Sequence, residues 1–293
     1  MSAKATIPGN GIRGGRLRSA DGSRIAYLKA GEGPVIIFLH ASMGTGTDWA
    51  AAAQRLTSSQ RVVFVDRRGH GASDWGVGRY AIEREVEDLL ALLDHFGPAT
   101  VVAHSFGATV ALEAALVAGR GRIERLALFE PPLPVAGPLA ADVLPGCLEA
   151  IDAGEYEPAL IAALAAVDLL PRNIDVLRGG LTDWAPLVRE APAFVRELAA
   201  VNALAPGVDR FRALDLPTLL LSGEYSPAHL RFTGRALAEA LSTPLHTLGG
   251  CGHSAPIFAA AEVAAKIDEF IRLAGPVENP VSLVLDQSAV SGE

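Results

Sequence analysis

The sequence predicts an α/β fold in which a mostly parallel sheet is flanked by helices, with a helical segment inserted near the middle of the chain. Short apolar runs typical of buried strands alternate with longer segments of helical periodicity. The chain of 293 residues is 50% hydrophobic and 20% charged, which provides apolar side chains for a large core. Alternating strands and helices imply right-handed crossovers between parallel strands.

Five strands are expected before residue 130. Val35–Leu39 and Arg61–Val65 are apolar runs that suit strands buried on both faces. The other three predicted strands are Arg24–Lys29, Thr100–Ala103 and Ile123–Phe129. Ligands of such sheets bind beyond the carboxyl ends of the strands, so chemistry is expected in the loops that follow them.

Helices are expected between these strands. Asp48 is suited to cap a helix from Trp49 to Leu56. Apolar residues at helical spacing predict a helix over Ile82–Phe96, which Gly97-Pro98 ends. A further helix, Ala108–Ala118, starts directly after the strand at 100–103.

The second half of the chain begins with a different pattern. Residues 131–213 are rich in Ala, Leu and Pro and lack a clear strand, so they are expected to form a helical cap. Regular alternation then resumes, with strands at Thr218–Leu221 and Leu245–Leu248 and helices at Ala228–Leu241 and Ala259–Leu273. The predicted organisation is a core of residues 16–130 and 214–273, a cap of residues 131–213, and flexible ends at 1–15 and 274–293.

The charge and the cysteines restrict the partners and the compartment. A net charge of −8 without a basic block disfavours nucleic acid and an anionic membrane surface. Cys147 and Cys251 are far apart in the sequence, which favours a reducing compartment over a disulfide framework. No run approaches 18 apolar residues and the start lacks a signal-like apolar region, so a cytoplasmic protein is expected. The expected partner is a small-molecule substrate, and a homodimer stays open.

One serine stands in a tight turn between a predicted strand and a predicted helix. The segment Ala103-His104-Ser105-Phe106-Gly107 matches the pattern G-x-S-x-G except that Ala103 replaces the first Gly. Small residues are needed at both ends because the turn is tight and strained. Ser105 is therefore the expected nucleophile, and a serine that caps the helix is the alternative.

Two earlier loops also leave strands with polar residues. His40-Ala41-Ser42-Met43-Gly44 resembles an H-G-x loop, so the backbone N–H groups of Ser42 and Phe106 are candidates to hold an oxyanion. His40 itself is expected to be structural. The run from Asp66 to Ser73, D-R-R-G-H-G-A-S, is expected to brace the loop below the site.

A glycine-rich loop between the last strand and the last helix presents one histidine. In Gly249-Gly250-Cys251-Gly252-His253-Ser254, the glycines allow the loop to present the imidazole of His253. His253 is the expected base that takes the proton of Ser105. The ordinary helical or strand contexts of His95, His229 and His246 predict surface positions.

Together these four loops resemble the α/β-hydrolase superfamily over about residues 16–273, in particular its serine esterase, haloperoxidase-like and lactonase-like branch with a helical cap. The resemblance implies acyl transfer through an acyl-enzyme that water clears, without a metal or an organic cofactor. A serine nucleophile, in place of aspartate, argues against a haloalkane dehalogenase or an epoxide hydrolase.

The sequence departs from this family at the acid of the triad. Most members place Asp about three residues after the Gly that ends the seventh strand, where this chain has Ser226. Glu130, directly after the predicted strand Ile123–Phe129, which corresponds to the sixth strand of the family, is the expected acid, and Pro131 biases its backbone towards an extended conformation. Glu224, at the usual loop but two residues early, is the alternative acid. A third possibility is that neither glutamate serves as the acid.

The expected function is hydrolysis of a small hydrophobic carboxylic ester or lactone. Met43, Leu133 and Trp184 are the apolar side chains expected to bind the substrate. Two alternatives stay open. One is a non-hydrolytic or C–C bond-cleaving reaction at the same site, by a lyase or a cofactor-free oxygenase. The other is a catalytically silent binding protein on this scaffold.

Overall fold

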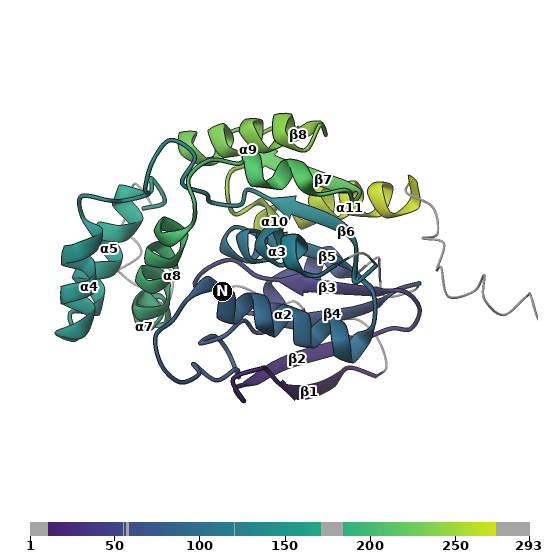
Figure 1. Cartoon of the computed structure of the whole chain (residues 1–293), viewed down its shortest axis with the longest axis horizontal. Coiled ribbons are helices and arrows are strands. Elements are labelled where there is room, and N and C mark those ends of the chain that lie inside the picture. Colours follow the sequence, from purple (N-terminus) through teal and green to yellow (C-terminus); the bar gives the residue numbers. More distant parts are fainter. Residues whose placement is uncertain (1–10, 55, 57–58, 120, 171–183, 274–293) are drawn as a thin grey trace, which may run out of the picture.

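The computed structural model describes residues 11–54, 56, 59–119, 121–170 and 184–273. The flexible ends predicted from the sequence lie largely outside these residues. In the described part, the chain forms one eight-stranded sheet with helices on both faces (Figure 1). The strands are β1 (Arg13–Arg18), β2 (Arg24–Ala30), β3 (Val35–Leu39), β4 (Arg61–Val65), β5 (Ala99–His104), β6 (Ile123–Phe129), β7 (Thr218–Gly223) and β8 (Leu245–Leu248).

The sheet has the strand order β1-β2-β4-β3-β5-β6-β7-β8. β2 pairs antiparallel with both β1 and β4, and every other pair of neighbours is parallel. The predicted α/β fold with a mostly parallel sheet is therefore confirmed. In a parallel arrangement, the carboxyl ends of β3, β5, β6 and β7 meet at one edge, and the loops that leave these strands lie close together.

Helices cover both faces of this sheet and also form a group at one end of it (Figure 1). On or beside the sheet lie α1 (Ala50–Ala53), α2 (Ile82–Phe96), α3 (Phe106–Val117), α9 (Ala228–Ala240), α10 (Ala255–Phe258) and α11 (Ala260–Leu273), with 3₁₀ turns η1 (Gly46–Trp49) and η3 (Asp209–Ala213). The separate group is α4 (Leu144–Asp152), α5 (Tyr156–Ala166), α7 (Trp184–Arg189) and α8 (Ala191–Ala203). No helix in the described ranges is long and apolar enough to cross a membrane.

Successive side chains of β3 point to opposite faces of the sheet and pack in two different cores. Val35, Ile37 and Leu39 of β3 pack with α2, α3 and α9 on one face of the sheet. Ile36 and Phe38 pack with η1, α1, α10 and α11 on the other face. Because all five side chains are buried, β3 is apolar along its whole length, as the sequence predicted.

The first strand was not expected from the sequence. β1 is rich in Gly and Arg, which gives it a weak strand signal, and its residues 13–15 fall in the segment expected to be flexible. Pairing of the whole strand with β2 holds it in place. The ring of Tyr27 lies where a side chain at Gly15 would project, 2.4 Å from an added Cβ, so the glycine allows this ring to cover the strand.

The first helical segment begins differently from the prediction. Thr45 is the residue before the first turn, and Asp48 is the third residue of that turn, where its carboxylate accepts the Thr45 N–H at 3.1 Å. Asp48 therefore completes the reciprocal pair of a capping box and is not the cap itself. The segment consists of the 3₁₀ turn η1 and the short helix α1.

Helices α4, α5, α7 and α8 form a layer with its own apolar core. Leu160, Phe194 and Val195 are among its most buried members. In Figure 1 this layer stands beside the sheet at one end of the strands. It comes from the segment that the sequence analysis describes as a cap, of which residues 171–183 lie outside the described ranges. We refer to these four helices as the cap.

Candidate active site

Ser105 stands in a strained turn between β5 and α3. Its backbone has φ 53° and ψ −125°, a conformation that is unfavourable for a residue with a side chain. The turn is held by its N–H, which donates to the Phe129 carbonyl at 2.8 Å. A side chain at Gly107 would lie 2.5 Å from the His40 carbonyl oxygen, so only glycine fits there. The turn presents a largely buried serine at the carboxyl edge of the sheet.

Ser105, His253 and Glu130 form one hydrogen-bonded chain. Nε2 of His253 lies 3.0 Å from Oγ of Ser105, and Nδ1 lies 2.7 Å from Oε2 of Glu130. Ser105 and Glu130 directly follow β5 and β6, and His253 stands in the loop after β8, 148 and 123 residues away from them in the sequence. The structure thus brings together the three residues that the sequence singled out as nucleophile, base and acid.

Glu130 is buried and is held at both of its oxygens. Oε1 accepts hydrogen bonds from the Ser222 hydroxyl at 2.7 Å and from the Gly223 N–H at 2.8 Å, while Oε2 faces His253. Burial alone would raise the pKa of Glu130. The hydrogen bond and charge of His253, together with the Ser222 hydroxyl, outweigh burial and lower this pKa below its usual value.

The backbone of Glu130 differs from the prediction. Pro131 favours an extended residue before it, but Glu130 has φ 49°, in the left-handed region. Its N–H donates to the Leu221 carbonyl of β7 at 3.2 Å, so the chain turns sharply at the end of β6 while still paired to β7. This turn explains the departure, because tertiary hydrogen bonds at Glu130 override the local preference set by proline.

Neither the alternative acid Glu224 nor Ser226, which stands where the family has Asp, makes a hydrogen bond to His253 in the described chain. Glu224 is exposed, and its Oε2 accepts the Gly250 N–H at 2.8 Å. Ser226 is buried close to Glu130 and helps to lower the pKa of that carboxyl group. Ser226 thus occupies the position after β7 where the family has Asp. The carboxylate that contacts His253 comes instead from Glu130, after β6.

His104, the residue before the serine, supports the histidine loop. Its Nε2 lies 2.9 Å from the carbonyl oxygen of His253, and the two rings are 4.8 Å apart. Burial, and then the neighbouring His253, lower the pKa of His104 well below its usual value. A neutral His104 with its proton on Nε2 donates to this carbonyl and fixes the backbone from which the His253 side chain projects.

Two backbone N–H groups near Ser105 donate no hydrogen bond to any of the described residues. They belong to Ser42 and Phe106. Phe106 is the first residue of α3, where backbone N–H groups lack partners within the helix. Ser42 follows β3, whose loop is braced by His40: its Nε2 accepts the Arg67 N–H at 2.9 Å. The structural role expected for His40 agrees with these contacts.

Ser105 and His253 line a cavity of about 30 Å³ beneath the cap. Most of its wall is apolar and comes from the cap and from the loop after β6. Among the described residues, Met43, Leu133 and Trp184 do not line it. Leu133 is buried in the core under α3, and Met43 and Trp184 pack against the cap core. The apolar character of these side chains did not show whether they line the cavity or pack in an apolar core.

His229 and Glu197 are polar residues of the cavity wall that sequence reasoning missed. His229 was expected at the surface, but it is half-buried at the start of α9. Burial and then the neighbouring His253 lower the pKa of His229 below its usual value. The available signal was its position after β7, at the same sheet edge as Ser105. Glu197 lies in a helix without a motif, and no sequence signal marked it.

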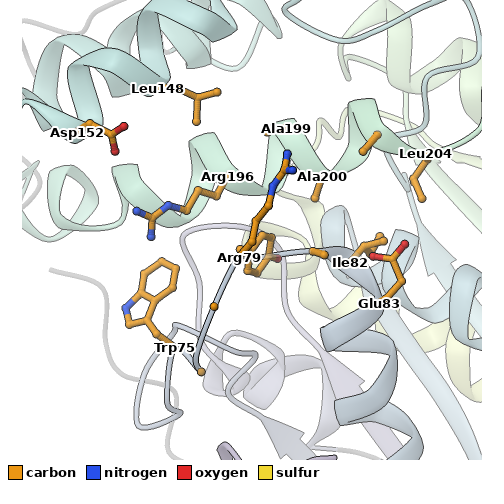
Figure 2. Close-up of a pocket in the computed structure, with 15 residues that line it drawn as sticks. Trp75, Arg79, Ile82, Glu83, Leu148, Asp152, Arg196, Ala199, Ala200 and Leu204 are labelled. Atoms are coloured by element: carbon orange, nitrogen blue, oxygen red, sulfur yellow. The ribbon is translucent and has the colours of Figure 1, made fainter. Parts of the chain in front are cut away.

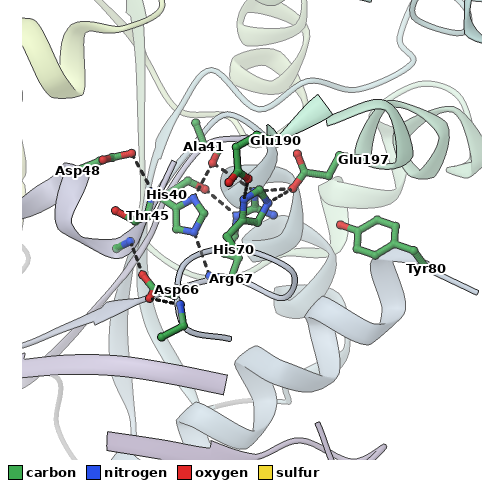
Figure 3. Close-up of polar contacts among 12 residues, drawn as sticks. His40, Ala41, Thr45, Asp48, Asp66, Arg67, His70, Tyr80, Glu190 and Glu197 are labelled. Carbon is green, nitrogen blue, oxygen red and sulfur yellow. Dashed lines mark hydrogen bonds and ion pairs between the residues drawn. The ribbon is translucent and has the colours of Figure 1, made fainter. Parts of the chain in front are cut away.

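A buried cluster of charges joins the loop after β4 to cap helix α8 (Figure 3). Nη1 of Arg67 lies 2.9 Å from Oε1 of Glu85, and Nη2 lies 2.6 Å from Oε1 of Glu197. His70 also bridges two acids, with Nε2 2.9 Å from Oε1 of Glu197 and Nδ1 2.9 Å from Oε2 of Glu190. These contacts agree with the bracing role expected for the 66–73 run and extend it to the cap.

Each member of this cluster influences the protonation of the others. Burial opposes a charge on His70, but Glu197 and Glu190 outweigh it and raise the pKa of His70 to about 9. Burial likewise opposes a charge on Glu197, but Arg67 and His70 lower the pKa of Glu197 to about 2. At neutral pH, the cluster therefore contains a protonated imidazole and an ionised carboxylate.

A larger hollow of about 740 Å³ lies against a different face of α8 (Figure 2). Arg196 and Ala199 of α8 line it together with residues 75–83 of the core, and the Arg196 guanidinium lies 5.4 Å from the centre of the Trp75 ring. Neither Ser105 nor His253 lines this hollow. The small cavity, and not the large hollow, therefore contains the reactive arrangement.

Known proteins resemble this chain across most of its described length. A model of the alpha/beta hydrolase family matches residues 36–266. A non-heme haloperoxidase of Rhodococcus erythropolis is 28% identical over 219 residues, which are 70% of this chain and 80% of that protein. An alpha/beta hydrolase of Sphaerobacter thermophilus has a solved structure that is 29% identical, with a TM-score of 0.74, and the alignment covers 88% of this chain and 100% of that chain. An uncharacterized protein of Mycobacterium tuberculosis is 34% identical over 103 residues, but these are only 33% of this chain and 29% of that protein.

Proposed function

The chain belongs to the alpha/beta hydrolase family, and we propose that it is a serine hydrolase that cleaves a small carboxylic ester or lactone through an acyl-enzyme. One observation carries the proposal: the continuous hydrogen-bonded chain from Ser105 through His253 to Glu130, open to a cavity at its serine end. A serine hydroxyl is a weak nucleophile, and a base within hydrogen-bond distance activates it.

The partners of His253 determine which of its nitrogens carries the proton. An ionised Glu130 can only accept, so Nδ1 of His253 carries the proton and donates it to Oε2. Nε2 is then the acceptor, and at 3.0 Å it is placed to take the Ser105 proton as Oγ attacks the carbonyl carbon. The same nitrogen later returns the proton to the leaving alcohol, and it activates the water that clears the acyl group.

Glu130 has two functions in this mechanism. Its carboxylate keeps the imidazole in one tautomer, and it stabilises the positive charge that His253 gains during attack. The hydrogen bonds from Ser222 and Gly223 fix the carboxylate in place, so it need not reorganise when that charge develops.

The N–H groups of Ser42 and Phe106 are the proposed oxyanion hole. Neither N–H has an acceptor in the described chain, and both residues line the cavity beside Ser105. A single such donor is typically worth about 3 kcal/mol of barrier. The cavity beside Ser105 is small, about 30 Å³, which favours a small substrate.

Hydrolysis of p-nitrophenyl acetate by the wild-type protein and by Ser105→Ala tests the proposal. The wild type is expected to release nitrophenol with a burst, because acylation precedes a slower deacylation. Ser105→Ala is expected to keep the fold, checked by circular dichroism, and to lose the activity. Equal turnover by the two proteins would exclude Ser105 as the nucleophile.

A further inference from the structure

Glu197 lines the cavity, and one of its carboxylate oxygens has no hydrogen-bond partner in the described part of the chain. The residue is only 2% exposed, and Oε1 accepts from Arg67 at 2.6 Å and from His70 at 2.9 Å. Oε2 has no hydrogen-bond partner among the described residues. In Figure 3, dashed lines reach only one of the two oxygens. A buried acceptor without a partner is unfavourable, and native proteins keep few of them.

The same neighbours keep this carboxylate ionised. Burial would protonate Glu197, but Arg67 and His70 both face Oε1 and hold the pKa of Glu197 down to about 2. The Ser42 hydroxyl also lowers this pKa as a neighbouring donor, which places it near the carboxylate, although it forms no hydrogen bond to Oε2. An ionised carboxylate has no proton to donate, so Oε2 can only accept a hydrogen bond.

Glu197 is also close to the reacting centre. Glu197, Ser42 and Ser105 line one cavity of about 30 Å³, and the Ser42 N–H is one of the proposed oxyanion donors. A substrate group that reaches Glu197 therefore lies in the same cavity as the carbonyl carbon that Ser105 attacks.

We propose that Oε2 of Glu197 accepts a hydrogen bond from the substrate, and that the preferred ester or lactone carries a hydroxyl or amino group close to the scissile carbonyl. This inference rests on the proposed function, because it names the substrate class of the same site. It changes the sequence-based expectation of a purely hydrophobic substrate. The mostly apolar wall remains suited to the rest of a small molecule.

The charges around Glu197 also predict which substrates are rejected. The carboxylates of Glu85, Glu190 and Glu197 outnumber the cations of Arg67 and His70 in the cluster. An ester that carries its own carboxylate near the carbonyl would be repelled, because the cavity offers no unpaired cation from this cluster. The expected order of preference is hydroxyl, then hydrogen, then carboxylate.

Matched esters and one isosteric substitution test the proposal. We expect the wild type to have a higher kcat/KM for methyl 2-hydroxybutanoate or methyl 3-hydroxybutanoate than for methyl butanoate. In Glu197→Gln, the amide oxygen can still accept from Arg67 and His70, and the amide NH₂ replaces Oε2 with a donor. The hydroxyl-to-hydrogen ratio of kcat/KM should therefore fall at least about tenfold, since hydrogen bonds to charged groups are the stronger ones. The methoxy group of methyl 2-methoxybutanoate can only accept a hydrogen bond. The kcat/KM of this ester relative to methyl butanoate should therefore rise in Glu197→Gln.

Glu85→Gln is the matched control. Glu85 is equally buried and pairs with the same Arg67, but it does not line the cavity. It should leave the hydroxyl-to-hydrogen ratio unchanged. A role of Glu197 in anchoring the cap alone predicts that both variants lose stability and that neither changes the ratio. That result would overturn the inference.

Binding to Ser105→Ala separates this inference from the proposed function. Calorimetry with the same esters measures binding without turnover, so it reports substrate recognition even if the reaction is not ester hydrolysis. It also tests the preference for a hydroxyl group if Glu197→Gln does not fold. Tighter binding of the hydroxy esters than of methyl butanoate supports the inference. Equal binding, or tighter binding of monomethyl succinate, contradicts it. Loss of the proposed function alone would appear as absent turnover with the binding preference intact.

Discussion

Two buried glutamates, one that follows a strand of the sheet and one on the cap, differ in their hydrogen bonds. Glu130, on the sheet, is satisfied at both oxygens by Ser222, Gly223 and His253. Glu197, on the cap, concentrates Arg67 and His70 on one oxygen and leaves the other without a described partner. Both residues are almost fully buried, and neighbours lower the pKa of each.

The difference assigns the two carboxylates to different tasks. A carboxylate whose every hydrogen bond is made within the protein acts on another protein group, in this case His253. A carboxylate held at one oxygen is fixed in place and still has an acceptor for a ligand. Substitutions at the two residues should therefore alter different quantities: reaction rate at Glu130, and stability and substrate preference at Glu197.

The largest expected effect is on the rate of Glu130→Gln. An amide cannot stabilise the imidazolium, and it can leave His253 in the wrong tautomer, so kcat should fall by about 10³–10⁴-fold. Steady-state kinetics with a p-nitrophenyl ester measures this loss, and a urea melt should show little change in stability. Glu224→Gln is the control, since Glu224 accepts the Gly250 N–H and makes no hydrogen bond to His253 among the described residues, and it should keep near-full activity. Near-full activity in Glu130→Gln would contradict the assigned role.

A loss of stability is expected for Glu197→Ala. The substitution leaves the guanidinium of Arg67 and the imidazolium of His70 without one of their buried partners, which should lower the free energy of unfolding by about 4 kcal/mol. Urea denaturation at neutral pH measures this change. Glu87→Ala, which removes a partly exposed pair with Arg84, should have little effect. Equal stability of the two variants would show that the buried cluster does not hold the cap.

The same cluster predicts how stability depends on pH. His70 has a folded pKa of about 9, above the value of about 6.5 expected when unfolded. The folded state therefore binds the extra proton, and this stabilisation is fully present below about pH 6.5 and is lost as the pH rises through 9. The loss should reach about 3 kcal/mol in the wild type relative to His70→Gln. Urea denaturation of both proteins between pH 6 and 9.5 measures how their free energies of unfolding change with pH. The same pH dependence in the two proteins would argue against a charged His70.

The smallest effect is expected for His104→Phe. This change keeps a buried ring but removes the donor to the His253 carbonyl, so the histidine loop loses one fixed point. The expected outcome is a roughly tenfold lower kcat, as for the loss of one hydrogen bond, with KM almost unchanged. Steady-state kinetics with the same ester measures both constants. An unchanged kcat would show that the loop is positioned without His104.

The sheet and its reactive edge could be predicted because local signals and tertiary structure agree there. β3, β4, β6 and β8 have the predicted bounds. For β3 and β4 the reason is that strands buried on both faces require continuous apolar runs. Ser105, His253 and Glu130 could be named because each stands at the end of a strand, where chain order and parallel pairing bring residues together.

The cap side of the cavity could not be predicted, because its geometry depends on packing between distant helices. Leu133 and Trp184 have the composition of ligand-binding residues but lie in apolar cores. Glu197 has no local signal, since its neighbours Arg67 and His70 are more than 120 residues away in the sequence. The same limit explains the missed strand β1, which pairing with β2 stabilises.

Covalent labelling with a fluorophosphonate tests the central claim most directly, because the probe traps a serine that a neighbouring base activates. Intact-mass measurement and peptide mapping should find one adduct per chain of the wild-type protein, on Ser105. Ser105→Ala should take up no label, and His253→Ala should label far more slowly. An unlabelled wild-type protein, or an adduct on another residue that persists in Ser105→Ala, would contradict the assignment of Ser105 as the activated nucleophile.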